Sequence, residues 1–344
     1  MQGMNTQPRR SQPRRSVLIA ARLITAVVSL AGAEGVLWLM GYPNWWGLDP
    51  ALGGGSPEYQ CDSELGWSAR QGQFRLVWAD GSAPFPFQYT NWSGGRRATA
   101  EQEPPHTAAG RPQVLFFGDS YVQGYGLSDW ETLPWIVQKR HPELEVSNFG
   151  AGLYGTYQSY LAMKKAVHGP ATVYYLLNQY QEGRTAGDAS FLRIMKPPPP
   201  GCFYPYVTLS GGQIQPHRSN GEVVWWLSRK LRTVAMVHDY KLILQSYLRL
   251  KDRRRATELL LVKMNEIVRA QGGKFTVILL DLTPEQQPDY RQFLASQQIA
   301  YIEDDRPGPM DKNLRLPDGH PNGKLNSLLA ESIDPMPILS DRRH

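Results

Sequence analysis

The stretch from Gln113 to Tyr121, Gln-Val-Leu-Phe-Phe-Gly-Asp-Ser-Tyr, decides the fold. Its first five residues form a short apolar run, which is typical of a strand buried on both faces of a parallel sheet. Gly118 permits a tight turn, and the carboxylate of Asp119 can brace it. Ser120 is therefore expected at the C-terminal edge of a strand, where open α/β sheets bind their ligands.

Outward from this stretch, apolar strand patterns alternate with helical ones. Further strands are expected at 144–148, 172–177, 275–280 and 299–302. Helices are expected near 130–140, 156–167, 222–271, 287–297 and 322–333. This alternation predicts an α/β fold, a three-layer α/β/α sandwich around a mainly parallel five-stranded sheet.

The chain divides by composition into five segments. Residues 42–110 carry short alternating pieces, which predict an accessory lead-in with small strands or, alternatively, a mobile stalk. Residues 183–240 interrupt the α/β pattern with prolines, glycines and aromatic residues, which favours a substrate-shaping lid over a plain structural insertion. The expected segments are a basic arm at 1–16, a membrane anchor at 17–41, the lead-in at 42–110, an α/β domain at 111–335 and a tail at 336–344.

The apolar segment 17–41 is long enough to cross a bilayer, whose core needs about 20 helical residues. Four arginines precede it, which predicts a single-pass inner-membrane protein with its N-terminus in the cytoplasm and its catalytic domain outside, in the periplasm. Trp38 suits the far interface. A cleaved signal peptide, with Ala31-Gly32-Ala33 as its cleavage site, and a buried soluble helix are the alternatives.

Composition excludes some classes of function. Of the 344 residues, 41% are hydrophobic and 20% are charged, a balance that predicts a packed core. The net charge of +6 comes mostly from the N-terminal arginines, so the folded body lacks the basic patch of a nucleic-acid-binding protein. Cys61 and Cys202 have no metal-type spacing; they form one disulfide or remain two thiols.

Asp318-Gly319-His320, near the C-terminus, complements the serine. A serine hydroxyl needs a base to become a useful nucleophile, and His320 is the expected base. Asp318 is expected to hold the imidazole of His320 in the right tautomer and to stabilise the imidazolium. The glycine-rich turn at 148–156, which fails the G-x-G-x-x-G pattern of dinucleotide-binding loops, exposes backbone N–H groups that can bind an oxyanion together with the N–H of Ser120.

These blocks resemble those of the SGNH/GDSL hydrolase superfamily, in a membrane-anchored bacterial branch similar to polysaccharide acetylesterases and O-acetyltransferases. The spacing of Asp318 and His320, with one residue between them, resembles that of the O-acetyltransferases. Asp311 is the nearest substitute for Asp318 as the acidic residue of the triad. The resemblance extends to 62–67, 91–96 and 154–158, and it implies a flavodoxin-like SGNH fold.

The resemblance also implies an oxyanion hole made of three groups: the N–H of Ser120, a glycine N–H and a side-chain amide. Gly152 is the expected glycine, with Gly150 and the Leu153 amide as alternatives. Asn178 is the expected amide, although it can instead be a turn residue. Gln179 and Arg184 are weaker candidates for this role.

Together these features predict a serine esterase that removes acetyl or related acyl groups from a polysaccharide or glycoconjugate without a metal or organic cofactor. Its expected partners are an ester-bearing glycan or lipid, the membrane and polysaccharide-export machinery, with no nucleic acid. The alternatives are an O-acetyltransferase acting on a surface polysaccharide, a lipid esterase, and a catalytically idle protein that keeps the fold to bind glycans.

Overall fold

A computed structural model describes the chain over residues 15–44, 57–78, 84–104, 110–194, 203–219, 222–304 and 312–333. The chain forms two compact units. The first combines the N-terminal region, up to Trp46, with Val223–Tyr240. The second combines Gly47–Glu222 with Lys241–His344 and contains all the residues predicted to be catalytic. The basic arm up to residue 14, Asp311, Cys202 and the tail lie outside the described residues.

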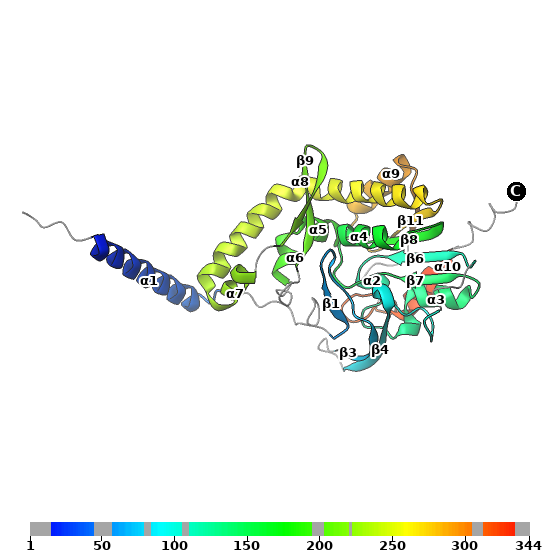
Figure 1. The fold of residues 1–344 in the computed structure, drawn as a ribbon, viewed down its shortest axis with the longest axis horizontal. Coiled ribbons are helices and arrows are strands. Elements are labelled where there is room, and N and C mark those ends of the chain that lie inside the picture. The colour runs from blue at the N-terminus through cyan, green and yellow to red at the C-terminus, as the bar shows by residue number, and fades with distance from the viewer. Residues whose placement is uncertain are drawn as a thin grey trace, which may run out of the picture. The chain divides into compact units, whose positions relative to one another are not determined.

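The second unit is built on an eight-stranded sheet, drawn in Figure 1. Five neighbouring strands run parallel. They are, in order, β12 (Ala300–Glu303), β11 (Lys274–Leu279), β8 (Ala171–Leu177), β6 (Gln113–Phe117) and β7 (Glu145–Asn148). Three antiparallel strands extend the sheet beyond β7. They are β5 (Arg96–Arg97), β4 (Phe85–Trp92) and β3 (Gly72–Trp78).

The prediction of a five-stranded sheet is therefore wrong in number. All five expected strands are present, and they are the five parallel ones. The lead-in adds β3, β4 and β5, because Arg97 of β5 pairs with Asn148 at the free edge of β7. Pairing of this kind covers a sheet edge that would otherwise expose unpaired backbone groups.

Helices cover both faces of the sheet. In Figure 1, α3 (Leu133–Arg140) and α10 (Gly323–Ser332) lie on one side, and α4 (Thr156–Ala166) lies on the other with the C-terminal part of α8 (Arg232–Ala270). The α3 side holds an apolar core, which includes Val114, Phe116 and Leu176 from the sheet. On α8 the buried residues recur at helical spacing, at Ala256, Leu260, Leu261, Met264 and Val268. α9 (Gln286–Ser296) lies between β11 and β12 in the chain.

Shorter elements complete this unit. They are the hairpin of β1 (Tyr59–Asp62) and β2 (Gly66–Ala69), η2 (Ser93–Gly95), α2 (Ser120–Gln123), η3 (Asp129–Glu131), α5 (Gln181–Ala186), α6 (Ala189–Ile194) and the hairpin of β9 (Pro205–Ser210) and β10 (Gln213–Arg218). Cys61 on β1 is disulfide-bonded, and the sequence has one other cysteine, Cys202.

The first unit contains α1 (Arg15–Leu39), α7 (Glu222–Lys230) and the first turns of α8. α1 is long and apolar enough, by length and composition, to cross a membrane. Its apolar side chains are exposed over most of its length, as expected for a helix without a single buried stripe.

Candidate active site

Ser120 is placed by a sharp turn after β6. The turn requires glycine at Gly118, because a Cβ there would lie 2.7 Å from Cγ2 of Val122. Asp119 then caps α2, since its Oδ1 accepts a hydrogen bond of 3.0 Å from the N–H of Tyr121. The predicted position of Ser120, just beyond the C-terminal end of a strand, is confirmed, and Ser120 is also the first residue of α2.

Ser120, His320 and Asp318 form one chain of hydrogen bonds. Oγ of Ser120 lies 2.9 Å from Nε2 of His320. Nδ1 of His320 lies 2.5 Å from Oδ2 of Asp318, and the backbone N–H of His320 donates to Oδ1 of the same carboxylate at 3.0 Å. The two oxygens of Asp318 thus fix both the ring and the backbone of the histidine, although only Gly319 separates the two residues.

A short hairpin carries the acid and the base. Arg315 and Pro321 form an antiparallel bridge, and the N–H of Leu316 donates to the carbonyl of His320 at 2.8 Å. Gly319 has a φ of 92°, in the region that favours glycine, and therefore permits the tight turn between Asp318 and His320.

The base of this hairpin is anchored by a buried ion pair. Both guanidinium nitrogens Nη1 and Nη2 of Arg315 donate to the carboxylate of Asp281, at 2.7 and 2.6 Å. Burial raises the pKa of Asp281, and the charge of Arg315 opposes this effect. The sequence offered no motif for this pair, because the two residues are far apart in the chain and lack any characteristic spacing.

Two tyrosines flank the imidazole of His320. The ring of Tyr121 meets it edge-on at 5.3 Å between centroids, and that of Tyr125 is tilted at 5.0 Å. Burial raises the pKa of Tyr121 above its usual range, so this tyrosine keeps its hydroxyl proton. The rings limit the positions open to the imidazole and so help to hold it toward Ser120.

Asp119 has a second role behind the nucleophile. Its carboxylate is fully buried, and its Oδ2 accepts hydrogen bonds from Nδ2 of Asn178, at 2.7 Å, and from Nη1 of Arg184. Arg184 lies on α5, with the rings of Tyr180 and Phe191 5.3 and 5.8 Å from its guanidinium carbon. The guanidinium thus compensates a carboxylate that would be costly to bury alone.

The side-chain amide of Asn178 uses only some of its hydrogen-bonding groups. Its Oδ1 accepts from the N–H of Tyr180, and one hydrogen of Nδ2 goes to Asp119. In the described part of the chain, no acceptor is recorded for its second N–H. The oxyanion role predicted for Asn178 would use this second N–H.

The glycine-rich turn differs from expectation at Gly152. Its N–H donates to the hydroxyl of Tyr59 on β1 at 3.0 Å, so the amide predicted to bind the oxyanion is already bonded. The Gly150 N–H is also paired, with Oδ1 of Asn148 at 2.9 Å. Among the described residues, neither the Leu153 N–H nor the Ser120 N–H has a recorded acceptor. The Leu153 N–H, which is one of the alternatives to Gly152, is therefore our preferred candidate for the backbone donor of this turn.

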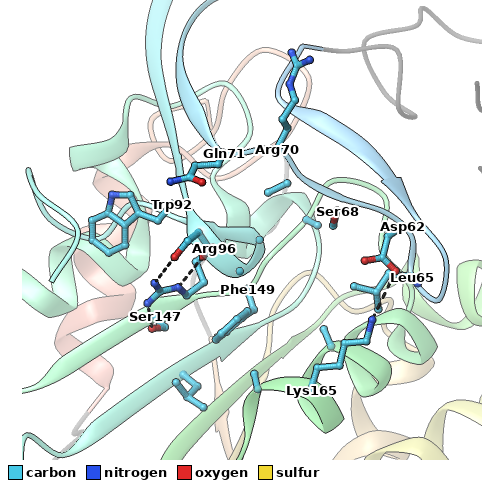
Figure 2. A pocket seen from close by; sticks show the side chains of 18 of the residues that line it. Asp62, Leu65, Ser68, Arg70, Gln71, Trp92, Arg96, Ser147, Phe149 and Lys165 are labelled. Carbon is cyan, nitrogen blue, oxygen red and sulfur yellow. Dashed lines mark hydrogen bonds and ion pairs between the residues drawn. The ribbon is translucent and has the colours of Figure 1, made fainter. Parts of the chain in front are cut away.

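A groove of about 760 Å³ in the second unit is lined in part by the glycine-rich turn. Figure 2 shows its wall of polar and aromatic side chains, among them Trp92, Phe149, Ser147 and Gln71. Its lining includes neither Ser120 nor His320, but Phe149, Ala151 and Tyr154 of the turn contribute to it. The N–H of Ala151 donates to the carbonyl of Gly118, two residues before the nucleophile, so the turn that borders the groove also contacts the turn that carries Ser120.

Two of the cations that line the groove are paired with carboxylates, whereas Arg70 lines it with no carboxylate partner among the described residues. Arg96 is paired with Glu103 at 2.5 Å, and Lys165 with Glu64 at 3.0 Å. The guanidinium of Arg70 and hydroxyl, amide and aromatic groups remain for a ligand, a combination that can bind a sugar. No group of three or more histidine, cysteine, aspartate or glutamate residues suited to a metal ion occurs in the described ranges.

Comparisons with known proteins give fold likeness only. No family model matches the chain, and no curated protein matches it. Among solved structures, the crystal structure of TesA is similar, with 17% identity over 64% of this chain and 94% of that one and a TM-score of 0.37. A member of the lipolytic protein G-D-S-L family from Veillonella parvula is similar at 12% identity, with the same coverage and TM-score. The arrangement of side chains, and not this likeness, is the basis for a functional proposal.

Proposed function

We propose that the chain is a serine esterase of the SGNH type that acts outside the cytoplasmic membrane, to which α1 anchors it. One observation carries the proposal: Ser120, His320 and Asp318 are joined by hydrogen bonds of 2.9 and 2.5 Å. A nucleophile bonded to a base, which a third group orients, is the arrangement that activates a serine hydroxyl.

In the first half of the reaction, Oγ of Ser120 attacks the carbonyl carbon of the ester. Nε2 of His320 accepts the hydroxyl proton as the new C–O bond forms. Asp318 stabilises the resulting imidazolium and keeps its ring in place. When the tetrahedral intermediate collapses, His320 returns the proton to the leaving alcohol, and an acyl group remains on Ser120.

Three N–H groups are assigned to the negatively charged oxygen of the tetrahedral intermediate. They are the backbone N–H of Ser120, the backbone N–H of Leu153 and the second side-chain N–H of Asn178. Donors fixed in a folded site stabilise developing charge without reorganising at the moment of reaction, which gives them a large catalytic effect.

In the second half, water attacks the acyl-enzyme with His320 as the base, and release of the acid restores Ser120. Attack by a sugar hydroxyl in place of water would make the same chain an O-acetyltransferase. The two reactions share every residue of the site, so only the products distinguish them.

The proposed substrate is an acylated polysaccharide or glycoconjugate. The groove beside the glycine-rich turn supports it, because its hydroxyl, amide and aromatic groups suit sugars and two of its cations, Arg96 and Lys165, are paired with carboxylates. The proposed location, at the outer surface of the membrane, would bring the esterase near polysaccharide-export machinery. The length and apolar composition of α1 support the membrane part of the proposal.

Replacement of Ser120 tests the function directly. We expect Ser120→Ala to abolish both hydrolysis of an aryl acetate and labelling by a fluorophosphonate probe, while circular dichroism stays unchanged. Ser296→Ala, at an exposed position on α9, is the matched control and should leave both unchanged. Full activity of the Ser120 variant would refute the assignment. Free acetate released from an acetylated glycan indicates an esterase; transfer to an added acceptor glycan indicates the transferase.

A further inference from the structure

The first unit exposes an apolar and basic surface on α7 and the first turns of α8. Trp226 is 58% exposed, Val237 65% and Tyr240 67%. Val237 and Tyr240 are three residues apart and therefore share one face of the helix. The last two residues of α7, Arg229 and Lys230, are exposed and follow Trp226 by three and four residues. Large exposed apolar side chains that adjoin polar ones mark interaction surfaces.

This surface, which we call the elbow (Glu222–Tyr240), is fixed to the apolar helix α1. The carboxylate of Glu34 on α1 accepts hydrogen bonds from the backbone N–H groups of Arg232 and Thr233, at 2.7 and 3.0 Å. It also accepts one from the hydroxyl of Thr233 at 3.1 Å. Glu34 thus caps α8 from a different helix and satisfies N–H groups that have no partner within α8.

A second contact holds the elbow just beyond the end of α1. Nε of Arg232 donates to the carbonyl of Tyr42 at 3.0 Å, and the hydroxyl of Tyr42 donates to Oδ2 of Asp239 at 2.7 Å. Figure 1 shows the C-terminal end of α1 beside the turn between α7 and α8. The elbow is therefore attached at two points, one before and one after the last residue of α1.

These attachments set the depth of the elbow once α1 spans a membrane, as proposed above. The 25 residues of α1 give a length of about 37 Å at 1.5 Å per residue, against a hydrocarbon core of about 30 Å. Glu34 is followed by only five more residues of α1, or about 7.5 Å along the axis. A helix capped by Glu34 must lie close to the boundary between headgroups and acyl chains.

We propose that the elbow is a second membrane contact, which lies in the outer interface of the same bilayer that α1 crosses. Trp226, Val237 and Tyr240 enter the headgroup and acyl boundary, where tryptophan and tyrosine are favoured. Arg229 and Lys230 bind the anionic headgroups, as basic residues do on interfacial amphipathic helices. The proposal rests on the transmembrane assignment of α1.

Lipid suits this surface better than a second copy of the chain. Two copies would bring the cations of Arg229 and Lys230 toward each other, whereas an anionic leaflet attracts them.

Lipid-borne quenching of labels on the full-length protein in vesicles tests the proposal. The variants Trp226→Cys and Tyr240→Cys each carry a fluorophore on the introduced cysteine, and the lipids carry a nitroxide at the boundary between headgroups and acyl chains. Leu30→Cys on α1 reports the membrane anchor, and Ser296→Cys on α9 is the exposed control. Labelling without reductant keeps the Cys61 disulfide intact.

We expect quenching at positions 226 and 240 to be several times that at position 296 in vesicles that contain anionic lipid. It should fall when the anionic lipid is left out, and it should fall in anionic vesicles when Arg229 and Lys230 are both replaced by Gln. Quenching at position 30 alone, with 226 and 240 at the level of 296, overturns the elbow proposal while the anchor stands. Cross-linking between copies through position 226 or 240, without quenching, also overturns it. An unquenched position 30 refutes the anchor itself.

Discussion

Nε2 of His320 lies 2.9 Å from Oγ of Ser120, although 200 residues separate them in the chain. The contact arises because Ser120 follows the C-terminal end of β6 and His320 sits on a hairpin tied to Asp281, which follows β11. Parallel strands end at the same edge of a sheet, so residues that follow different strands can meet there. The edge of the sheet brings the nucleophile and its base together.

Asp318 is expected to act by orienting His320. Asp318→Asn keeps the size of the side chain but removes the charge that stabilises the imidazolium and selects its tautomer. We expect kcat for an aryl acetate to fall about 10³-fold or more with KM little changed. Steady-state kinetics with purified protein measure both constants.

Asp252→Asn, an exposed carboxylate on α8, is the control and should behave as the unmodified protein. Retention of full kcat in Asp318→Asn would show that another group supplies the acid. The one-residue spacing to His320 would then be incidental to the reaction.

The residues of the triad could be predicted because each leaves a local mark in the sequence. A buried strand followed by Gly-Asp-Ser and an isolated Asp-Gly-His are both short patterns, and β6 begins and ends at the predicted residues. Apolar runs likewise predicted the five parallel strands, and burial on both faces selects for such runs in β6 and β8.

The features that could not be predicted depend on pairs of residues that are distant in the chain. Tyr59 reaches the Gly152 amide across 93 positions, and Glu34 caps α8 across 198. Neither contact changes the sequence pattern around either residue, so neither can be predicted from one segment of the chain. The extension of the sheet by β5 is of the same kind, since two residues, Arg96 and Arg97, are too few to give a periodic signal.

The ion pair of Asp119 and Arg184 is expected to stabilise the turn that carries Ser120. Arg184→Met leaves a buried carboxylate without its cation and should lower the free energy of unfolding by about 3 kcal/mol. Asp119→Asn should restore part of this loss in the double variant, because the buried charge is gone. Denaturant unfolding of the two single variants and the double variant gives the coupling energy.

Arg255→Met is the matched control, since this exposed arginine pairs with Glu258 on the surface of α8 and should cost less than 1 kcal/mol. Additive losses in the Asp119 and Arg184 cycle would contradict the coupling. The rate of fluorophosphonate labelling should fall with Arg184→Met at temperatures where the variant remains folded, because a loosened turn misplaces Ser120.

Glu303 is expected to make part of the stability depend on pH. The hydrogen bond from Nη2 of Arg291, at 2.6 Å, lowers the pKa of Glu303 below its ordinary value of 4.5. The resulting stabilisation is present above that value and is lost as the pH falls through the lower pKa of the folded state. Because Arg291 is half exposed, the contribution is expected to stay below about 1 kcal/mol.

Denaturant unfolding over a series of pH values compares Glu303→Gln with the unmodified protein. The difference in unfolding free energy should be largest near neutral pH and shrink on acidification. Arg291→Met should remove the same pH dependence, since it removes the main cause of the shift. A difference that stays constant with pH would show that Glu303 acts through packing alone.

Tyr59→Phe tests whether the Gly152 amide takes part in the reaction. The substitution deprives two buried donors, the Gly152 N–H and the side-chain amide of Gln123, of the hydroxyl that accepts from them. Unsatisfied buried donors should lower the free energy of unfolding by about 1–3 kcal/mol. Tyr247→Phe, at an exposed position on α8, should have no such effect.

If Leu153 is the backbone donor that joins Ser120 at the oxyanion, kcat of Tyr59→Phe should stay close to that of the unmodified protein at temperatures where both are folded. A Gly152 N–H that served the oxyanion would gain freedom when its tyrosine partner is removed, and kcat would then change markedly. Kinetics and unfolding measured on the same preparation therefore separate a structural role of this hydrogen bond from a catalytic one.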